Sequence, residues 1–169
     1  EAQGKPGLNR SDFTNFNPEG SAFVQDRWEY EGLVLNVGMR YDLFTPGAQV
    51  PDSDLPHGRY KGQWSPRLGV AYPISDRDVL SLHYGWTFQT PPRNYVFENR
   101  GSQSTVDVRG NPDLSPETNV SYQAAVQHMF SRDVAGQFAV FFKDIFGLIA
   151  TRQEVDDATG LLVPVYVNR

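Results

Sequence analysis

Hydrophobic and polar residues alternate with a period of two along most of the chain, and the clearest run is LVLNVGMRYDLF at residues 33–44. Its odd positions are all apolar, whereas its even positions include Asn36, Arg40 and Asp42. Side chains that alternate in this way lie on opposite faces of a β-strand, and a helix would place these polar residues within its apolar stripe. The run therefore predicts a strand with one apolar and one polar face.

The same alternation recurs on both sides of short polar or glycine-containing links, which is typical of β-hairpins. Residues 21–30 lead through Glu31-Gly32 into the run just described, and two further pairs turn at about 75–78 and 131–133. We therefore expect hairpins over about 21–44, 64–88 and 117–146, with a further strand starting near Val163. Long connections separate them, at about 45–63, 89–116 and 147–162.

The contrast between short turns and long connections favours a membrane barrel. Soluble domains rarely repeat loops longer than about 12–15 residues, whereas outer-membrane barrels have short periplasmic turns and long outer loops. Aromatic residues also fall at both ends of the expected strands, as in the interfacial girdles of such barrels. Trp28, Tyr30 and Tyr72 lie beside the short turns, and Tyr41, Phe44, Trp86 and Phe88 lie at the opposite ends. We predict an all-β fold, an antiparallel up-and-down meander, and the pattern favours a transmembrane β-barrel over a soluble sandwich.

Parity along each expected strand assigns its residues to lipid or to the barrel lumen. The lipid-facing set is Leu35, Val37, Met39, Leu68, Val70, Leu82, Tyr84, Val126, Phe138 and Val140. The lumen-facing set is Arg27, Asn36, Arg40, Asp42, Arg67, His83, Gln123 and Lys143. Glycines such as Gly38 and Gly69 share the second face, and small residues among charges suit a crowded, concave interior.

Composition narrows the class of protein further. The chain of 169 residues carries 15 Lys and Arg against 20 Asp and Glu, a net charge of −5, which argues against a nucleic-acid partner. It has no cysteine, and no apolar run approaches the roughly 18 residues of a membrane helix. An aromatic content of 13% indicates a folded chain in spite of a mean hydropathy of −0.48.

No pattern of residues indicates catalysis, a cofactor or a metal site. Hydrolase, metalloprotease, P-loop and dinucleotide motifs are absent from the sequence. The three histidines lie on different segments, and the acidic pairs Asp52/Asp54 and Asp156/Asp157 are interpreted as solvated loop residues. The candidates for ligand binding lie in the 89–116 connection, whose mixture of arginines and aromatics is typical of recognition surfaces. They are Arg93, Tyr95, Phe97, Arg100 and Arg109, although packing of the loop upon itself explains them equally well.

Four segments together resemble the barrel of TonB-dependent outer-membrane receptors, most closely the Oar-like branch that carries a carboxypeptidase-regulatory domain. They are FVQDRWEYEGLVLNVGMRYDLF, SPRLGVAYPISDRDVLSLHYGWTFQTP, GNPDLSPETNVSYQAAVQHMF and FFKDIFGLIATR, which cover most of residues 21–152. The resemblance implies a 22-stranded barrel closed by an N-terminal plug, which would contact the lumen-facing residues and receive energy from a TonB-type protein. It also implies location in the outer membrane of a Gram-negative bacterium, and uptake of an unidentified small substrate or peptide.

Three functional interpretations follow from the sequence. The first is a segment of the barrel wall of such a receptor, in contact with outer-membrane lipid, with the plug and remaining strands outside residues 1–169. The second is a soluble β-sandwich that binds a carbohydrate-like ligand, and the third is a small structural or adhesive outer-membrane barrel. None of the three is an enzyme.

Overall fold

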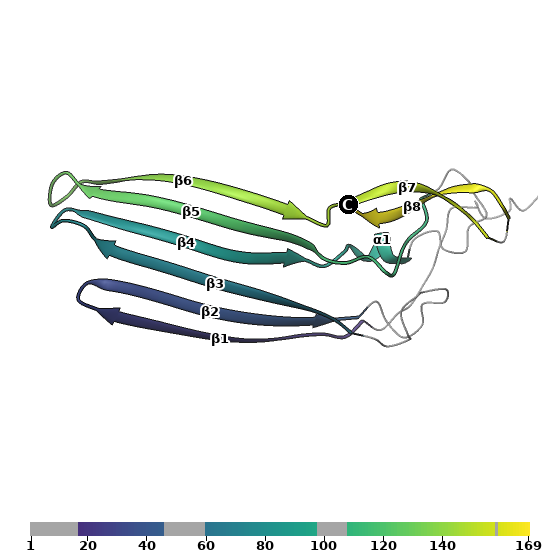
Figure 1. Ribbon diagram of the computed structural model, residues 1–169, viewed down its shortest axis with the longest axis horizontal. Coiled ribbons are helices and arrows are strands. Elements are labelled where there is room, and N and C mark those ends of the chain that lie inside the picture. Colours follow the sequence, from purple (N-terminus) through teal and green to yellow (C-terminus); the bar gives the residue numbers. More distant parts are fainter. Residues whose placement is uncertain (1–16, 46–59, 98–107, 158) are drawn as a thin grey trace, which may run out of the picture.

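The computed structural model describes residues 17–45, 60–97, 108–157 and 159–169. Six long strands form one antiparallel sheet in which neighbours along the chain are neighbours in the sheet (Figure 1). They are β1 (Glu19–Tyr30), β2 (Leu33–Phe44), β3 (Lys61–Pro73), β4 (Asp78–Gln89), β5 (Glu117–Met129) and β6 (Ala135–Phe146). This order confirms the predicted up-and-down meander. Among the described residues, no helix is long and apolar enough to cross a bilayer.

The tight turns β1–β2, β3–β4 and β5–β6 all lie at one end of the sheet, and β2, β4 and β6 end at the other (Figure 1). The β1–β2 turn places Glu31 at φ 46° and Gly32 at φ 84°. Positive φ at both central residues of a two-residue hairpin loop matches the right-handed twist of its strands, and glycine adopts it without a steric penalty. The β3–β4 turn is closed by a hydrogen bond of 2.9 Å from Ile74 N to Asp78 O.

The register places all ten predicted lipid-facing residues on one face of the sheet. One row of paired residues across this apolar face reads Trp28, Leu35, Val70, Leu82, Ala124 and Val140. Asp26 interrupts the face beside Val37, but its carboxylate accepts hydrogen bonds from Trp28 Nε1 at 2.6 Å and from Arg27 N at 2.8 Å. No second layer covers this face in the described part of the chain, where Leu82 is 46% and Phe138 73% exposed. A soluble sandwich would bury such a face against another sheet.

The ladder between β3 and β4 is shorter than the other ladders of the sheet. These strands pair from Pro73↔Val79 to Arg67↔Gly85, whereas β3 continues to pair with β2 as far as Lys61. The ladder ends beside Pro66, whose nitrogen cannot donate a hydrogen bond. The outer halves of β3 and β4 therefore separate, and we call this opening the β3–β4 seam.

A small outer layer stands beyond the loop ends of the long strands. It contains α1 (Arg93–Phe97), residues 108–116, and the two-stranded sheet of β7 (Ile149–Val155) and β8 (Leu162–Asn168) (Figure 1). We call these segments the outer cap. The expected strand near Val163 is β8, but a further strand, β7, lies within what the sequence predicted to be a long connection at 147–162. β7 follows β6 after Gly147, which has φ 68°, and β8 runs back until Arg169 N donates to Leu148 O.

Candidate functional site

All eight predicted lumen-facing residues share the polar face of the sheet. Arg27, Asn36, His83 and Gln123 fall in one cross-strand row with Gly69, and Arg67 and Lys143 fall in the next with Gly38, Gly85 and Ser121. Arg40 pairs with Ser65, and Asp42 with Gln63, nearer the loop end. The sequence pattern did not single out Phe23 on β1 and Phe141 on β6, which occupy the same face and are 74% and 73% exposed.

Glycines lie beside Arg67 and His83 at the centre of the polar face. Arg67 lies between Gly38 and Gly85 in the register, and a Cβ at either position would lie 3.7–3.8 Å from its side chain. A Cβ on Gly69 would lie only 3.2 Å from His83 Nδ1. A Cβ at Gly38 or Gly85 would make only ordinary contact with Arg67, whereas a side chain at position 69 would press against His83.

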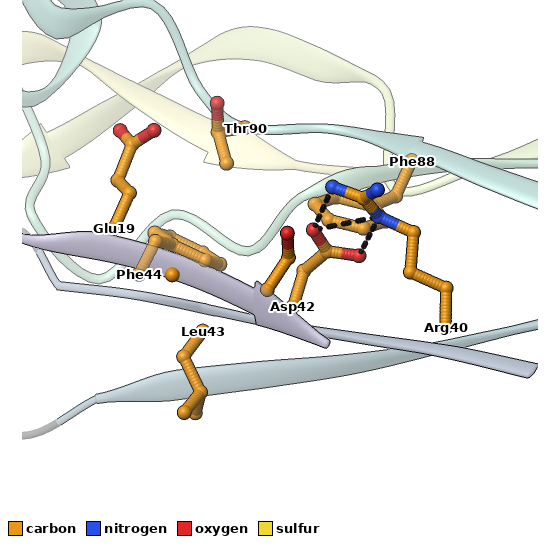
Figure 2. Close-up of a pocket in the computed structure, with 9 residues that line it drawn as sticks. Glu19, Arg40, Asp42, Leu43, Phe44, Phe88 and Thr90 are labelled. Carbon is orange, nitrogen blue, oxygen red and sulfur yellow. Dashed lines mark hydrogen bonds and ion pairs between the residues drawn. The ribbon is translucent and has the colours of Figure 1, made fainter. Parts of the chain in front are cut away.

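A pocket of about 200 Å³ lies at the loop end of the polar face (Figure 2). We call it the rim pocket, and its lining residues are Glu19, Gly20, Ser21, Arg40, Asp42, Leu43, Phe44, Phe88 and Thr90. In Figure 2, Phe44 stands on the pocket side of the sheet, whereas the side chain of Leu43 points away. The sequence analysis placed Phe44 and Phe88 in an aromatic girdle on the apolar face. For Phe44 this was wrong, because it follows the even positions of β2 and is 8% exposed.

An ion pair forms the floor of the rim pocket. The Arg40 Nε donates to both carboxylate oxygens of Asp42, at 2.9 and 2.8 Å, and its Nη2 donates to Oδ1 at 2.7 Å. The Asp42 side chain is 12% exposed and that of Arg40 is 41% exposed, so the guanidinium still reaches the pocket. Since Glu19 adds a second carboxylate, the rim pocket favours neutral or cationic groups over anions.

The outer cap holds most of the predicted ligand-binding residues, and it ties two of them into its own structure. The Tyr95 and Tyr166 rings stack with centroids 4.4 Å apart, and Asn111 N donates to Tyr95 O at 2.8 Å. Arg109 pairs with Asp156, and its backbone forms an isolated bridge with Val165. Arg93 is exposed and Phe97 half-buried. The other four candidates therefore lie together in the outer cap, and Arg100 lies outside the described residues.

The Arg109–Asp156 ion pair joins two segments of the outer cap. The Arg109 guanidinium, helped by backbone and hydroxyl hydrogen bonds from Thr159, lowers the pKa of Asp156 to about 2. The pair joins residues 47 positions apart. It therefore fixes the 108–116 segment against the β7–β8 connection, and this leaves Arg93 as the most accessible of the described candidates.

The described residues do not form a metal centre. Among residues 17–45, 60–97, 108–157 and 159–169, no three His, Asp or Glu side chains are grouped so that they could hold an ion. The polar face instead offers guanidinium, imidazole, amide and carboxylate groups beside exposed aromatic rings. Such a surface can bind and release a ligand, and it has the composition of a recognition surface.

Three solved receptors share this architecture. They are the hemophore receptor HasR of Serratia marcescens (21% identity, TM-score 0.65), the ferric enterobactin receptor PfeA of Pseudomonas aeruginosa (18%, 0.67) and the siderophore receptor PirA of Pseudomonas aeruginosa (18%, 0.64). Each match covers 90% of this chain, and 29%, 22% and 29% of the respective receptor. The chain thus spans less than a third of these proteins. These similarities show the fold, which is a segment of the wall of a large receptor barrel.

Residues 3–169 match the family model described as TonB dependent receptor-like, beta-barrel, and the chain belongs to that family. No curated protein sequence matches the chain. Membership confirms the predicted family, the all-β barrel fold and a location in the Gram-negative outer membrane, and it disfavours the soluble sandwich and the small structural barrel. The similar structures are receptors and transporters.

Proposed function

We propose that the chain forms part of the wall of a receptor that imports a small substrate or a peptide across the outer membrane. The observation that carries this proposal is the two-faced sheet, apolar on one side and polar on the other, with its tight turns at one end. The energy would come from a TonB-type protein acting through a plug outside this chain. The barrel binds and admits the substrate and performs no catalysis.

The two faces have separate roles in this proposal. The ten apolar residues from Leu35 to Val140 contact lipid, since an uncovered apolar face is stable only in hydrocarbon. The eight polar residues from Arg27 to Lys143 line the lumen and contact the plug. Exposure of large side chains such as Phe138 supports the first assignment, and the Arg40–Asp42 pair on the other face supports the second.

Ligand selection is assigned to the outer cap and the rim pocket. Arg93, Tyr95, Phe97, Arg100 and Arg109 remain the proposed ligand-binding residues. The packing of Tyr95 and Arg109 favours a role in positioning the cap, whereas exposed Arg93 is suited to direct contact. Resemblance of the four barrel segments supports the finer assignment to the Oar-like branch, which predicts a carboxypeptidase-regulatory domain ahead of the plug in the full-length protein.

Surface labelling of cells tests the proposed orientation. Residues 1–169 contain no cysteine, so Arg93→Cys in the outer cap and Asp76→Cys in the β3–β4 turn each add one new thiol, at opposite ends of the sheet, and the unsubstituted receptor gives the background labelling. A membrane-impermeant maleimide should label Arg93→Cys on intact cells, and Asp76→Cys only after the outer membrane is broken. Equal labelling of both on intact cells would contradict the proposal.

Substrate uptake requires a separate test in cells that express the full-length receptor. Accumulation of its substrate should require both the receptor and a functional TonB-type protein, and loss of either should abolish it. The intact mass of the purified receptor tests the Oar-like assignment. A mass too small to contain a domain before the plug would contradict that assignment and would leave the uptake proposal in place.

A further inference from the structure

A hydrogen-bonded polar pair interrupts the apolar face of the sheet at its turn end. Asp78 on β4 is paired with His128 on β5, one row beyond Leu80 and Val126, so both side chains lie on the face assigned to lipid. Asp78 Oδ1 lies 2.6 Å from His128 Nδ1, and Ser75 Oγ donates to Asp78 Oδ2 at 2.5 Å. Ionisable groups on the lipid side of a barrel are costly at the midplane and cost little near the interfaces. The pair therefore marks the depth of the lipid headgroups.

Exposed aromatic rings border this polar pair. The Phe130 ring meets the His128 ring edge-on, with the centroids 4.6 Å apart. Gly136 is paired with His128, and a Cβ on Gly136 would lie 3.0 Å from the Phe130 ring. The ring therefore lies over Gly136 on the apolar face, where Phe130 is 64% exposed. Tyr72 follows on the same face of β3 and is 47% exposed. Aromatic rings beside polar groups are typical of the membrane interface.

Two arginines bring positive charge to the same end of the sheet. Arg77 lies in the β3–β4 turn and Arg132 in the β5–β6 turn, and the turns are joined by a hydrogen bond of 2.8 Å from Met129 N to Arg77 O. Both arginines are exposed, and neither guanidinium has a hydrogen bond or an ion pair with another residue that the structure describes. Guanidinium groups bind phosphate oxygens through paired hydrogen bonds. The turns therefore offer two unused phosphate-binding groups at headgroup depth.

Carboxylates beside these arginines select for a headgroup that carries both signs of charge. Asp76 and Asp133 are exposed in the same two turns, next to Arg77 and Arg132, and Asp78 adds a third carboxylate. A headgroup with only negative charge would be repelled by these carboxylates. A phosphate together with a primary ammonium group satisfies both sets of charges. An ammonium donates hydrogen bonds to carboxylates, which a trimethylammonium group cannot do.

We infer that this turn-end cluster binds the phosphoethanolamine headgroup of a phospholipid in the leaflet that faces the periplasm. Arg77 and Arg132 donate to the phosphate, and Asp78 accepts from the ammonium group. The first carbons of the acyl chains lie against Phe130 and Tyr72. The inference rests on the proposed function, because it requires the apolar face to lie in lipid with the turns at the periplasmic side. It adds a specific headgroup to a face for which only hydrocarbon contact is proposed above.

Native mass spectrometry of the full-length receptor tests the inference. The receptor in detergent micelles is mixed with equal amounts of dioleoyl phosphatidylethanolamine, phosphatidylcholine and phosphatidylglycerol, which share their acyl chains and differ only in headgroup. The receptor that retains one lipid should carry mainly phosphatidylethanolamine. Arg77→Ala and Arg132→Ala should each lower its ratio to phosphatidylcholine about threefold. Arg152→Ala, an exposed arginine in the outer cap at the opposite end, should leave the ratio unchanged.

Three results would overturn the inference. They are equal retention of the three lipids, a preference for phosphatidylglycerol, and a preference for phosphatidylethanolamine that persists in both arginine variants. Heat-modifiable mobility on gels establishes that each variant is folded, and if one arginine variant does not fold, the other decides. Labelling of Asp76→Cys on intact cells would reject the proposed orientation of the receptor. Correct labelling without a headgroup preference would reject the lipid site alone.

Discussion

Replacing Leu82 by arginine tests whether the apolar face meets lipid. Leu82 lies near the middle of β4, pairs with Val70 and Ala124, and is 46% exposed. The cross-strand row that contains it carries no charged residue, so no carboxylate in that row can neutralise the new guanidinium. An arginine on the lipid face near the bilayer midplane costs about 2–4 kcal/mol. The folding equilibrium of Leu82→Arg should therefore fall by about 30-fold to 700-fold.

The matched control is Gln123→Arg, which places the same side chain at a similar depth on the polar face. Gln123 pairs with His83 and Phe141, and the added guanidinium would remain hydrated in the lumen. We expect its folding free energy to stay within about 0.5 kcal/mol of the unchanged receptor. The assay is refolding of the full-length receptor into lipid vesicles over a urea series, with the folded fraction read from heat-modifiable mobility.

The comparison of these two variants separates three cases. A large loss for Leu82→Arg alone supports the proposed assignment of the faces. Equal losses would mean that both faces lie in similar surroundings, which would refute the reasoning. A larger loss for Gln123→Arg would reverse the assignment and place the polar residues against lipid.

Three further predictions follow. Val37→Arg should cost less than Leu82→Arg in the same refolding assay, because Asp26 lies beside Val37 and can pair with the new charge; adding Asp26→Asn should remove the difference. The low pKa of Asp156, about 2 against 3.8 when unpaired, means that its pairing with Arg109 stabilises the outer cap fully above pH 3.8 and is lost as the pH falls toward 2. Pepsin cleavage of the cap should therefore rise over that interval, whereas Arg109→Ala should be cleaved equally throughout. Gly32→Ala should destabilise the β1–β2 hairpin by about 1 kcal/mol, measured as a lower urea midpoint, because alanine is strained at φ 84°.

Alternation predicted the six long strands because each has one face that is apolar at most of its positions. It could not predict β7, since Ile149–Val155 reads IATRQEV and has polar or charged residues on both faces. The five-residue helix α1 is too short to show helical periodicity. Local patterns therefore predicted the barrel wall, and they failed in the outer cap, where few residues have a uniformly apolar side.

The candidate sites depend on contacts that parity alone does not determine. The Arg109–Asp156 pair spans 47 positions, and no local motif links the two residues. The burial of Phe44 depends on which strands lie beside it. Continuing the parity of β6 would have placed Phe141 on the polar face.

The β3–β4 seam divides the sheet into two three-stranded halves that are joined by a ladder over only part of their length. Lys61 Nζ spans the outer end of this region, donating to Pro112 O at 3.1 Å and Leu114 O at 2.6 Å. Strand edges that lack a backbone partner exchange their amide hydrogens quickly and separate first under load. The stiffness of the wall is therefore uneven, and widening of the barrel at its outer end would concentrate at the seam, which Lys61 bridges.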